Sequence, residues 1–112
     1  MDKEVTAAML EMIRRNRGDR KRIEYSLKVY GYAQLLGRME GLNPEKQFVL
    51  ELTAILHDIG IHVSEAKYGY SDGKQQEIEG PPVARKIMEQ IAVDPDVVDR
   101  VCFIVSKHHT FS

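Results

Sequence analysis

Nine residues decide the fold of this chain: Leu52-Thr53-Ala54-Ile55-Leu56-His57-Asp58-Ile59-Gly60. Apolar residues in and before this stretch recur at helical spacing, namely Phe48, Leu52, Ile55 and Ile59, with Val49, Leu50 and Leu56 on the flanks. A helix with so broad an apolar surface packs against neighbours on several sides. We therefore predict that it is the central, buried helix of the fold.

His57 and Asp58 stand at the end of this apolar run, where a buried helix has no favourable place for them. Removing an ionised carboxylate from water is costly unless a cation, hydrogen bonds or a metal ion compensates. Because Gly60 lets the chain turn away, the imidazole and the carboxylate can lean over one ion of the Zn, Mn, Fe, Co or Mg type. Two interpretations stay open: a metal site, or a structural pair in which His57 bonds a backbone carbonyl and Asp58 caps a neighbouring helix.

The bulk composition narrows the function classes. The 112 residues fit a single domain, residues 1–112, and 43% of them are apolar. Lys and Arg number 16 against 17 Asp and Glu, so no overall charge argues for a nucleic-acid or membrane-surface partner. No membrane span and no signal-peptide pattern appears, so we expect a soluble, cytoplasmic protein. Cys102 stands alone, which excludes an internal disulfide and predicts a small core residue.

Apolar periodicity and turn residues divide the chain into helices. Start and stop signals place them from Asp2 to Gly18, from about Arg20 to Glu40, from Asn43 to Gly60, from Gly80-Pro81-Pro82 onward and from Asp94-Pro95-Asp96 onward. No strand alternation and no internal repeat is found in the sequence. We therefore predict an all-α fold, a compact bundle of about five helices.

A basic run lies at the junction of the first two predicted helices. It contains six basic residues and one acid, Asp19, and the six are Arg14, Arg15, Arg17, Arg20, Lys21 and Arg22. The plain interpretation is a solvated helix end that suits the helix dipole. The alternatives are steering of a phosphorylated substrate or contact with a nucleic-acid backbone. Because no aromatic residues interleave with the run, we consider nucleic acid an unlikely partner.

Two further segments bear on a site. Residues 67–74 are rich in turn formers and lack a period, so we expect an exposed loop near the His57 end, which either shapes substrate access or simply connects helices. His108-His109 continue the stripe of Val98, Val101 and Val105. This tandem pair indicates either core histidines with satisfied hydrogen bonds or a polar, metal-lined cleft.

Together these residues resemble the HD-domain superfamily of metal-dependent phosphohydrolases, named for an adjacent His-Asp pair. The resemblance is carried by His57-Asp58-Ile59-Gly60, residues 22–29, Glu77-Ile78-Glu79-Gly80-Pro81 and His108-His109-Thr110. It covers Arg20 to Ser112 and is closest to small bacterial stand-alone HD proteins. It implies an all-helical fold, a chain that looks shortened at its C-terminus, and an uncovered apolar helix face that could pair with a second copy in a homodimer.

The resemblance implies a metal site with four usual ligands, of which only His57 and Asp58 transfer cleanly. The position of the first ligand holds Tyr25, whose phenol is a poor ligand near neutral pH, and the last aspartate would lie beyond residue 109. Gln76 replaces a histidine of two-metal members, whereas His108-His109 match a histidine pair of such members. We therefore expect a weakly held divalent ion (Mn, Fe, Mg, Zn, Co or Ni) with metal ligands His57, Asp58, His108 and His109.

The function that the resemblance implies is hydrolysis of a nucleotide or another small phosphoester. Asp58 and His57 would hold the ion that polarises the phosphoryl group, and Lys67 and Lys74 would contact the phosphate. The alternative is a degenerate, non-catalytic HD domain that binds a ligand or assembles with a partner. Tyr25 and the missing aspartate favour this alternative.

Overall fold

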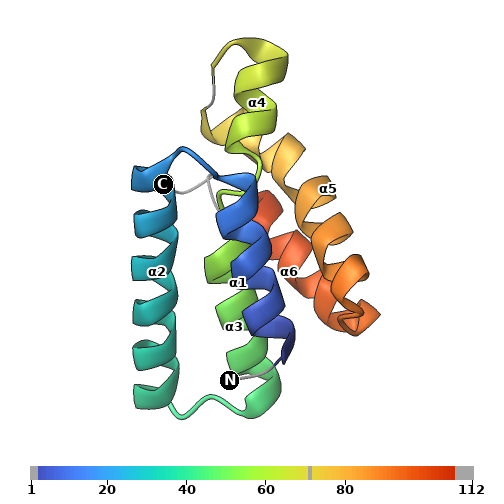
Figure 1. Cartoon of the computed structure of the whole chain (residues 1–112). Helices are drawn as coiled ribbons and strands as arrows, with labels where there is room; N and C mark the ends of the chain where they lie inside the picture. The colour runs from blue at the N-terminus through green and yellow to red at the C-terminus, as the bar shows by residue number, and fades with distance from the viewer. Residues whose placement is uncertain (1–2, 71, 108–112) are drawn as a thin grey trace.

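The structure is a computed structural model that describes residues 3–70 and 72–107 of the chain. Every regular element in these ranges is a helix (Figure 1), and the helices are α1 (Lys3–Arg15), α2 (Arg20–Met39), α3 (Pro44–Leu56), α4 (Ile61–Tyr68), α5 (Gly73–Ile91) and α6 (Pro95–Lys107). The predicted all-α bundle is confirmed, and α4 is the helix beyond the five expected. Across the described ranges, no helix has both the length and the apolar character that crossing a membrane requires.

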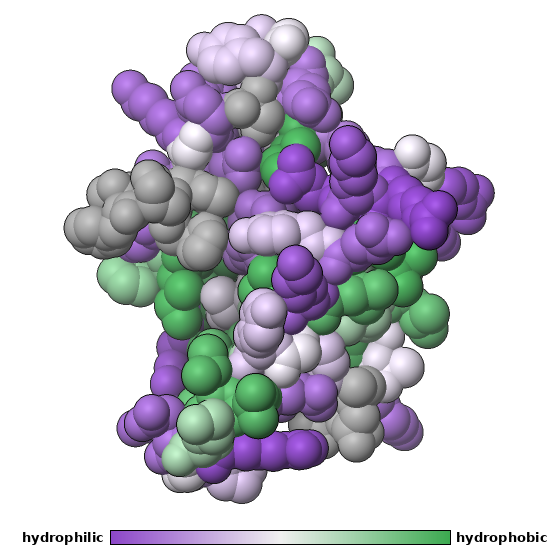
Figure 2. Space-filling model, turned by 90° about the vertical axis from the view of Figure 1, so that its left-hand side faces the viewer, coloured by the Kyte–Doolittle hydropathy of each residue, from purple (hydrophilic) through white to green (hydrophobic). Residues whose placement is uncertain are grey.

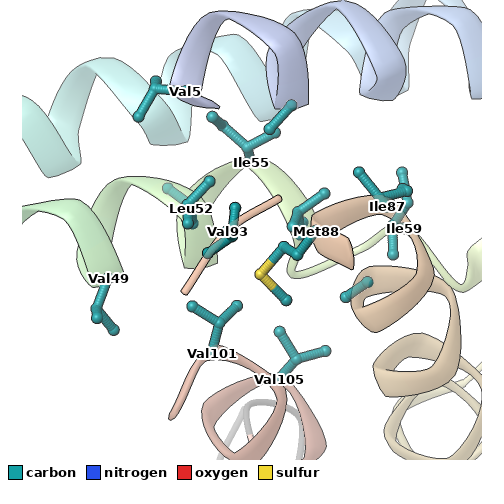
Figure 3. Close-up of a cluster of buried hydrophobic side chains, with 14 of the residues drawn as sticks. Val5, Val49, Leu52, Ile55, Ile59, Ile87, Met88, Val93, Val101 and Val105 are labelled. Carbon is teal, nitrogen blue, oxygen red and sulfur yellow. The ribbon is translucent and has the colours of Figure 1, made fainter. Parts of the chain in front are cut away.

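α3 lies at the centre of the bundle, as its apolar sequence predicts. It packs against α1, α2 and α6, and its second half is buried from Leu52 to Leu56. The core around it draws on distant parts of the chain (Figure 3), with Val5 from α1, Ile87 and Met88 from α5, and Val101 and Val105 from α6. The end of α3, which carries His57, is therefore held in place from several sides.

Side-chain caps fix the helices that flank the His57 region. Asp19 accepts a hydrogen bond from the backbone N–H of Arg22 at 3.2 Å and begins α2. Asn43 accepts one from the N–H of Lys46 at 2.8 Å, with Pro44 in the first turn of α3. The predicted starts of these two helices are confirmed.

The predicted helix start at Gly80 is wrong. α5 begins at Gly73, where Asp72 accepts a hydrogen bond from the N–H of Gln75, and Pro81 and Pro82 lie inside the helix. Proline lacks the N–H that a helix interior uses, which is why such a pair normally marks a helix start. The amides missing at Pro81 and Pro82 would have met the carbonyls of Glu77 and Ile78. Ile78 and Pro82 lie on an exposed side of α5, where water can bond a backbone carbonyl.

The segment expected as one loop is divided between two helices. Lys67 and Tyr68 end α4, while Gly73 and Lys74 begin α5. Among its residues α4 buries only Ile61 and Ser64, so no apolar stripe revealed this helix in the sequence. Polar contacts join α4 to α5 instead: Tyr68 Oη and Lys67 Nζ lie 2.7 and 3.3 Å from Glu79 Oε2. The Tyr68 hydrogen bond, assisted by Lys67, lowers the pKa of Glu79.

Cys102 is a buried residue of α6, as predicted. Its Sγ donates a weak hydrogen bond to the carbonyl of Pro81 at 3.6 Å, and burial raises the pKa of its thiol. The thiol therefore helps to join α6 to the middle of α5 and is not activated for chemistry.

Gly60 brings the turn after α3 into backbone contact with α5. A Cβ atom at Gly60 would lie only 2.7 Å from both the Cα and the N of Gly80. These are backbone atoms, so no side-chain rotation could relieve the clash. The contact sets the distance between the His57–Asp58 turn and α5.

We predict that Gly60→Ala lowers the free energy of unfolding by about 1–3 kcal/mol, the usual cost of overpacking a close contact. Equilibrium urea denaturation followed by circular dichroism measures this loss. Gly31→Ala is the matched control, because Gly31 lies within α2 with open space around the new methyl group. It should stabilise the protein by about 0.5–1 kcal/mol. A free energy of unfolding that Gly60→Ala leaves unchanged would contradict the close approach of Gly60 to Gly80.

Candidate active site

His57 and Asp58 lie directly after α3, and both side chains are buried. The apolar residues of α3 enter the core and carry this pair with them into the interior. The position that the sequence predicts for the pair, inside the molecule and side by side, is therefore observed.

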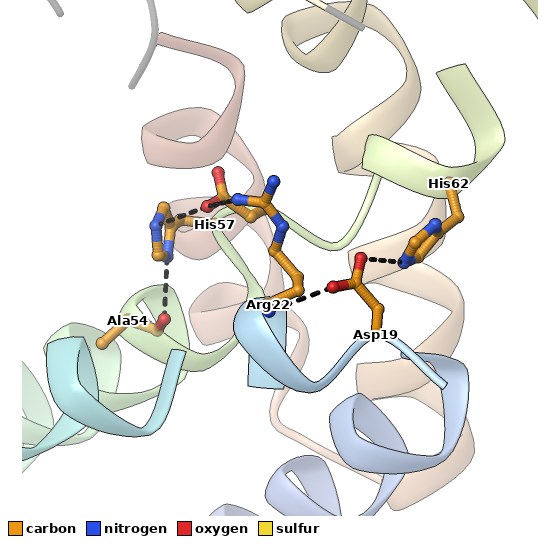
Figure 4. Close-up of polar contacts among 6 residues, drawn as sticks. Asp19, Arg22, Ala54, His57 and His62 are labelled. Carbon is orange, nitrogen blue, oxygen red and sulfur yellow. Dashed lines mark hydrogen bonds and ion pairs between the residues drawn. The ribbon is translucent and has the colours of Figure 1, made fainter. Parts of the chain in front are cut away.

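The imidazole of His57 has a defined orientation (Figure 4). Its Nδ1 lies 2.8 Å from the carbonyl oxygen of Ala54, and because that oxygen can only accept, Nδ1 carries the hydrogen. Its Nε2 lies 3.2 Å from Asp58 Oδ2. The interpretation in which His57 bonds a backbone carbonyl is thus correct, but the bond uses one nitrogen and turns the other toward the carboxylate. An orientation of this kind is common for histidines that bind metal.

Opposing effects set the protonation of His57. Burial lowers the pKa of His57, but the hydrogen bond to Asp58, the charge of Asp58 and the Ala54 carbonyl together raise it further, so the net shift is upward. Arg22 opposes this rise through its own positive charge. In the absence of metal, a proton is therefore favoured between Nε2 and the carboxylate.

Arg22 is a site residue that the sequence analysis did not single out. It comes from the first turn of α2, is half-buried, and places a guanidinium nitrogen 3.4 Å from Asp58 Oδ2. Its Nε is buried and has no hydrogen-bond partner among the described residues. A buried donor left unpaired costs about 1–3 kcal/mol, so this N–H is suited to an incoming acceptor such as a phosphate oxygen. In the sequence, the feature that could have pointed to Arg22 was its place at the end of the basic run.

The start of α2, which carries Arg22, lies close to α4 through a contact between Asp19 and a histidine. Besides capping the helix, Asp19 lies 3.3 Å from Nε2 of His62, the second residue of α4 (Figure 4). His62 Nδ1 in turn lies 3.3 Å from Glu65. The Asp19–His62 contact connects the start of α2 with α4, and the His62–Glu65 contact lies within α4.

Tyr25 lies beside His57, where the resemblance places the first metal ligand. The two ring centroids are 5.7 Å apart and the planes are tilted by 56°. Because Arg22 and Tyr25 are three residues apart, they lie on one face of α2. A side chain at position 25 can thus reach the neighbourhood of the pair.

The donor atoms of the pair fit one divalent ion, although they do not complete its coordination. With ligand bonds of about 2.1 Å, two adjacent donors on one ion lie about 3.0–3.4 Å apart. The observed separation of His57 Nε2 and Asp58 Oδ2, 3.2 Å, falls in this range. Within residues 3–70 and 72–107, however, no three His, Cys, Asp or Glu side chains gather into a metal-binding group. The predicted ligands His108 and His109 lie outside the described residues.

The other predicted site residues lie on α4 and α5. Gln76 is buried one turn before Gly80, whose backbone touches the turn at Gly60. Lys67 reaches Glu79, and Lys74 is exposed in the first turn of α5. A phosphate contact by either lysine stays a prediction.

The basic run is largely balanced by acids in the folded protein. Arg14 and Arg15 both pair with Glu11, and Arg20 pairs with Glu24. Together with the Arg22–Asp58 pair, these contacts give four of the six basic side chains of the run an acidic partner, and the Arg14 and Arg20 pairs lie at the surface. That nucleic acid is an unlikely partner stays a prediction.

The chain matches a known protein family. A family model described as HD domain matches residues 22–112, which is most of the chain. No curated protein and no solved structure gives a significant match to the chain. The matched region begins at Arg22 and includes the His57–Asp58 pair.

We predict that Asp58→Asn lowers the pKa of His57 in the metal-free protein from above its ordinary value to below it. Without the carboxylate, burial acts on the imidazole with little opposition. NMR titration of the imidazole resonances measures the change. Asp99→Asn, which removes the partner of Arg85 between α5 and α6, is the control and should leave the titration unchanged. An unaltered His57 titration in Asp58→Asn would refute the coupling of the pair.

Proposed function

Because the chain belongs to the HD-domain family, we propose that it is a metal-dependent phosphohydrolase that cleaves a nucleotide or another small phosphoester. Proteins of this family are generally metal-dependent phosphohydrolases. The observation that best supports the proposal for this chain is the buried, convergent pair of donors, His57 Nε2 and Asp58 Oδ2, 3.2 Å apart. Two such donors on one side of an ion leave the remaining coordination positions of the ion open to water and substrate.

The chain's own residues have separable roles in this reaction. A bound divalent ion supplies a Lewis acid and lowers the pKa of a bound water. Asp58 provides the anionic charge, and the Ala54 carbonyl orients His57 so that its Nε2 faces the same point. Arg22 contributes donors for phosphate oxygens, since its Nε–H has no partner among the described residues. Burial of the pair keeps bulk water from weakening these interactions.

One observation favours the alternative, a degenerate HD domain that binds a ligand or assembles without catalysis. Arg22 already places a positive charge 3.4 Å from Asp58 Oδ2, close to where an ion would lie. This positive charge compensates Asp58 without metal, and Tyr25 stands where the resemblance places a histidine ligand. The two proposals therefore differ in metal affinity, which can be measured directly.

We predict that the protein binds Mn²⁺ with a 1:1 stoichiometry in isothermal titration calorimetry and releases phosphate from small phosphoesters only when the ion is present. His57→Ala should lose both properties. Tyr25→His should tighten Mn²⁺ binding by about tenfold or more, because it adds an imidazole beside His57.

Leu27→His is the matched control for Tyr25→His. Leu27 lies on the same helix and is similarly exposed, 41% against 45% for Tyr25, but it points about 200° away around the helix. Leu27→His should leave the Mn²⁺ affinity unchanged. If the unaltered protein binds no Mn²⁺ and hydrolyses nothing, the non-catalytic alternative holds.

A further inference from the structure

A groove runs along the molecule from His57 between α2, α3 and α6. Its volume is about 340 Å³, which is within the range of small-molecule sites. His57 forms one end, and the apolar walls are made by Val29, Ala33, Leu36, Leu50, Ala54 and Ile104. This groove is separate from the polar side of His57, where Asp58 and Arg22 lie.

The groove meets the candidate active site at His57, the residue of the pair that lines it. On α2 the order is Arg22, Tyr25, Val29 and then Leu36, so the polar end of the site and the far end of the groove lie on one helix. Val29 and Leu36 are separated by about 10 Å at the rise of an α-helix. A molecule with a charged head at Arg22 could therefore extend its remaining part along the groove.

The lining offers few hydrogen bonds to a ligand. Among the described residues its polar side chains are Tyr32, Thr53 and His57. Thr53 Oγ1 already donates to the carbonyl of Val49 at 2.7 Å, and His57 Nδ1 is engaged with Ala54. A nucleobase placed here would leave several polar atoms without partners, which is costly. A hydrocarbon group would leave none.

Apolar exposure at the groove also favours an apolar occupant. Figure 2, which views the α2 side of the molecule, shows apolar side chains gathered in patches among polar ones. The exposed apolar residues that line the groove include Leu36 on α2 and Ile104 on α6, and the aromatic ring of Tyr32 is exposed beside them. A ligand that covers these side chains removes apolar surface from water.

We propose that the groove binds the apolar part of the substrate, and that the substrate is a phosphomonoester of an apolar alcohol. The phosphate would lie at Arg22 and the His57–Asp58 pair, so this inference rests on the proposed function at its polar end. In the reaction, the oxygen of water bonds to phosphorus as the bond to the ester oxygen breaks. A proton from water passes to that oxygen, and the products are the alcohol and inorganic phosphate.

The test compares hydrolysis of methyl, butyl and octyl phosphate by the full chain with Mn²⁺. kcat/KM should rise along the series, by about two- to fourfold for each added methylene that enters the groove. Leu36→Gln should lower the ratio of kcat/KM for octyl over methyl phosphate by about tenfold. Leu35→Gln should leave this ratio unchanged, since Leu35 is as exposed as Leu36, 55% against 54%, but does not line the groove. Because both variants replace an exposed side chain, folding is expected to be preserved.

A binding measurement separates this inference from the proposed function. Octylphosphonate, which is not hydrolysed, is titrated into the protein and followed by NMR. Binding that Leu36→Gln weakens and Leu35→Gln does not would support the groove even if no phosphoester is cleaved. Hydrolysis that is independent of chain length would overturn the apolar substrate and leave the phosphohydrolase standing.

Two other occupants would also overturn the inference. Sedimentation velocity that shows a dimer, converted to a monomer by Leu36→Gln, would assign the groove to a second copy of the chain. Octylphosphonate binding that becomes tighter in Phe111→Ala would assign it to residues 108–112 of the same chain.

Discussion

The burial of one carboxylate, that of Asp58, is the constraint on which this structure depends. An apolar central helix carries Asp58 into the interior, and a buried charge must be paired to be tolerated. The pairing comes from two directions, from His57 beside it and from Arg22 on α2. α2 must therefore begin where it does, because only its first turn brings Arg22 to Asp58. The Asp19 cap and its contact with His62 hold that turn in place.

The sequence predicted those parts of the fold that local rules control. The apolar run of α3, the caps Asp19 and Asn43, and the Asp94-Pro95 start of α6 each depend on residues within one or two turns, and all are observed. The helix class and the burial of the His57–Asp58 pair followed from the same patterns. The position of Tyr25 next to His57 followed from the family resemblance.

The features that sequence reasoning missed depend on contacts between distant segments. α4 is joined to α5 by hydrogen bonds from Tyr68 and Lys67 to Glu79, and Gly60, just before α4, lies close to Gly80. Neither kind of contact leaves a periodic pattern in the sequence. Arg22 looked like one member of a solvated basic run until the fold placed it against a residue 36 positions later. The groove beside His57 likewise arises only when α2, α3 and α6 are assembled.

The prolines inside α5 have a consequence for how the molecule opens. Positions 81 and 82 carry no amide hydrogen, so the hydrogen-bond ladder of α5 is interrupted near its middle. The N-terminal half of the helix is joined to α4, and the C-terminal half belongs to the main core through Ile87 and Met88. An interrupted ladder transmits unfolding poorly from one half to the other. We therefore expect α4 and the N-terminal half of α5 to open together as a small cooperative unit, exchanging their amide hydrogens with solvent while the core around α3 stays protected.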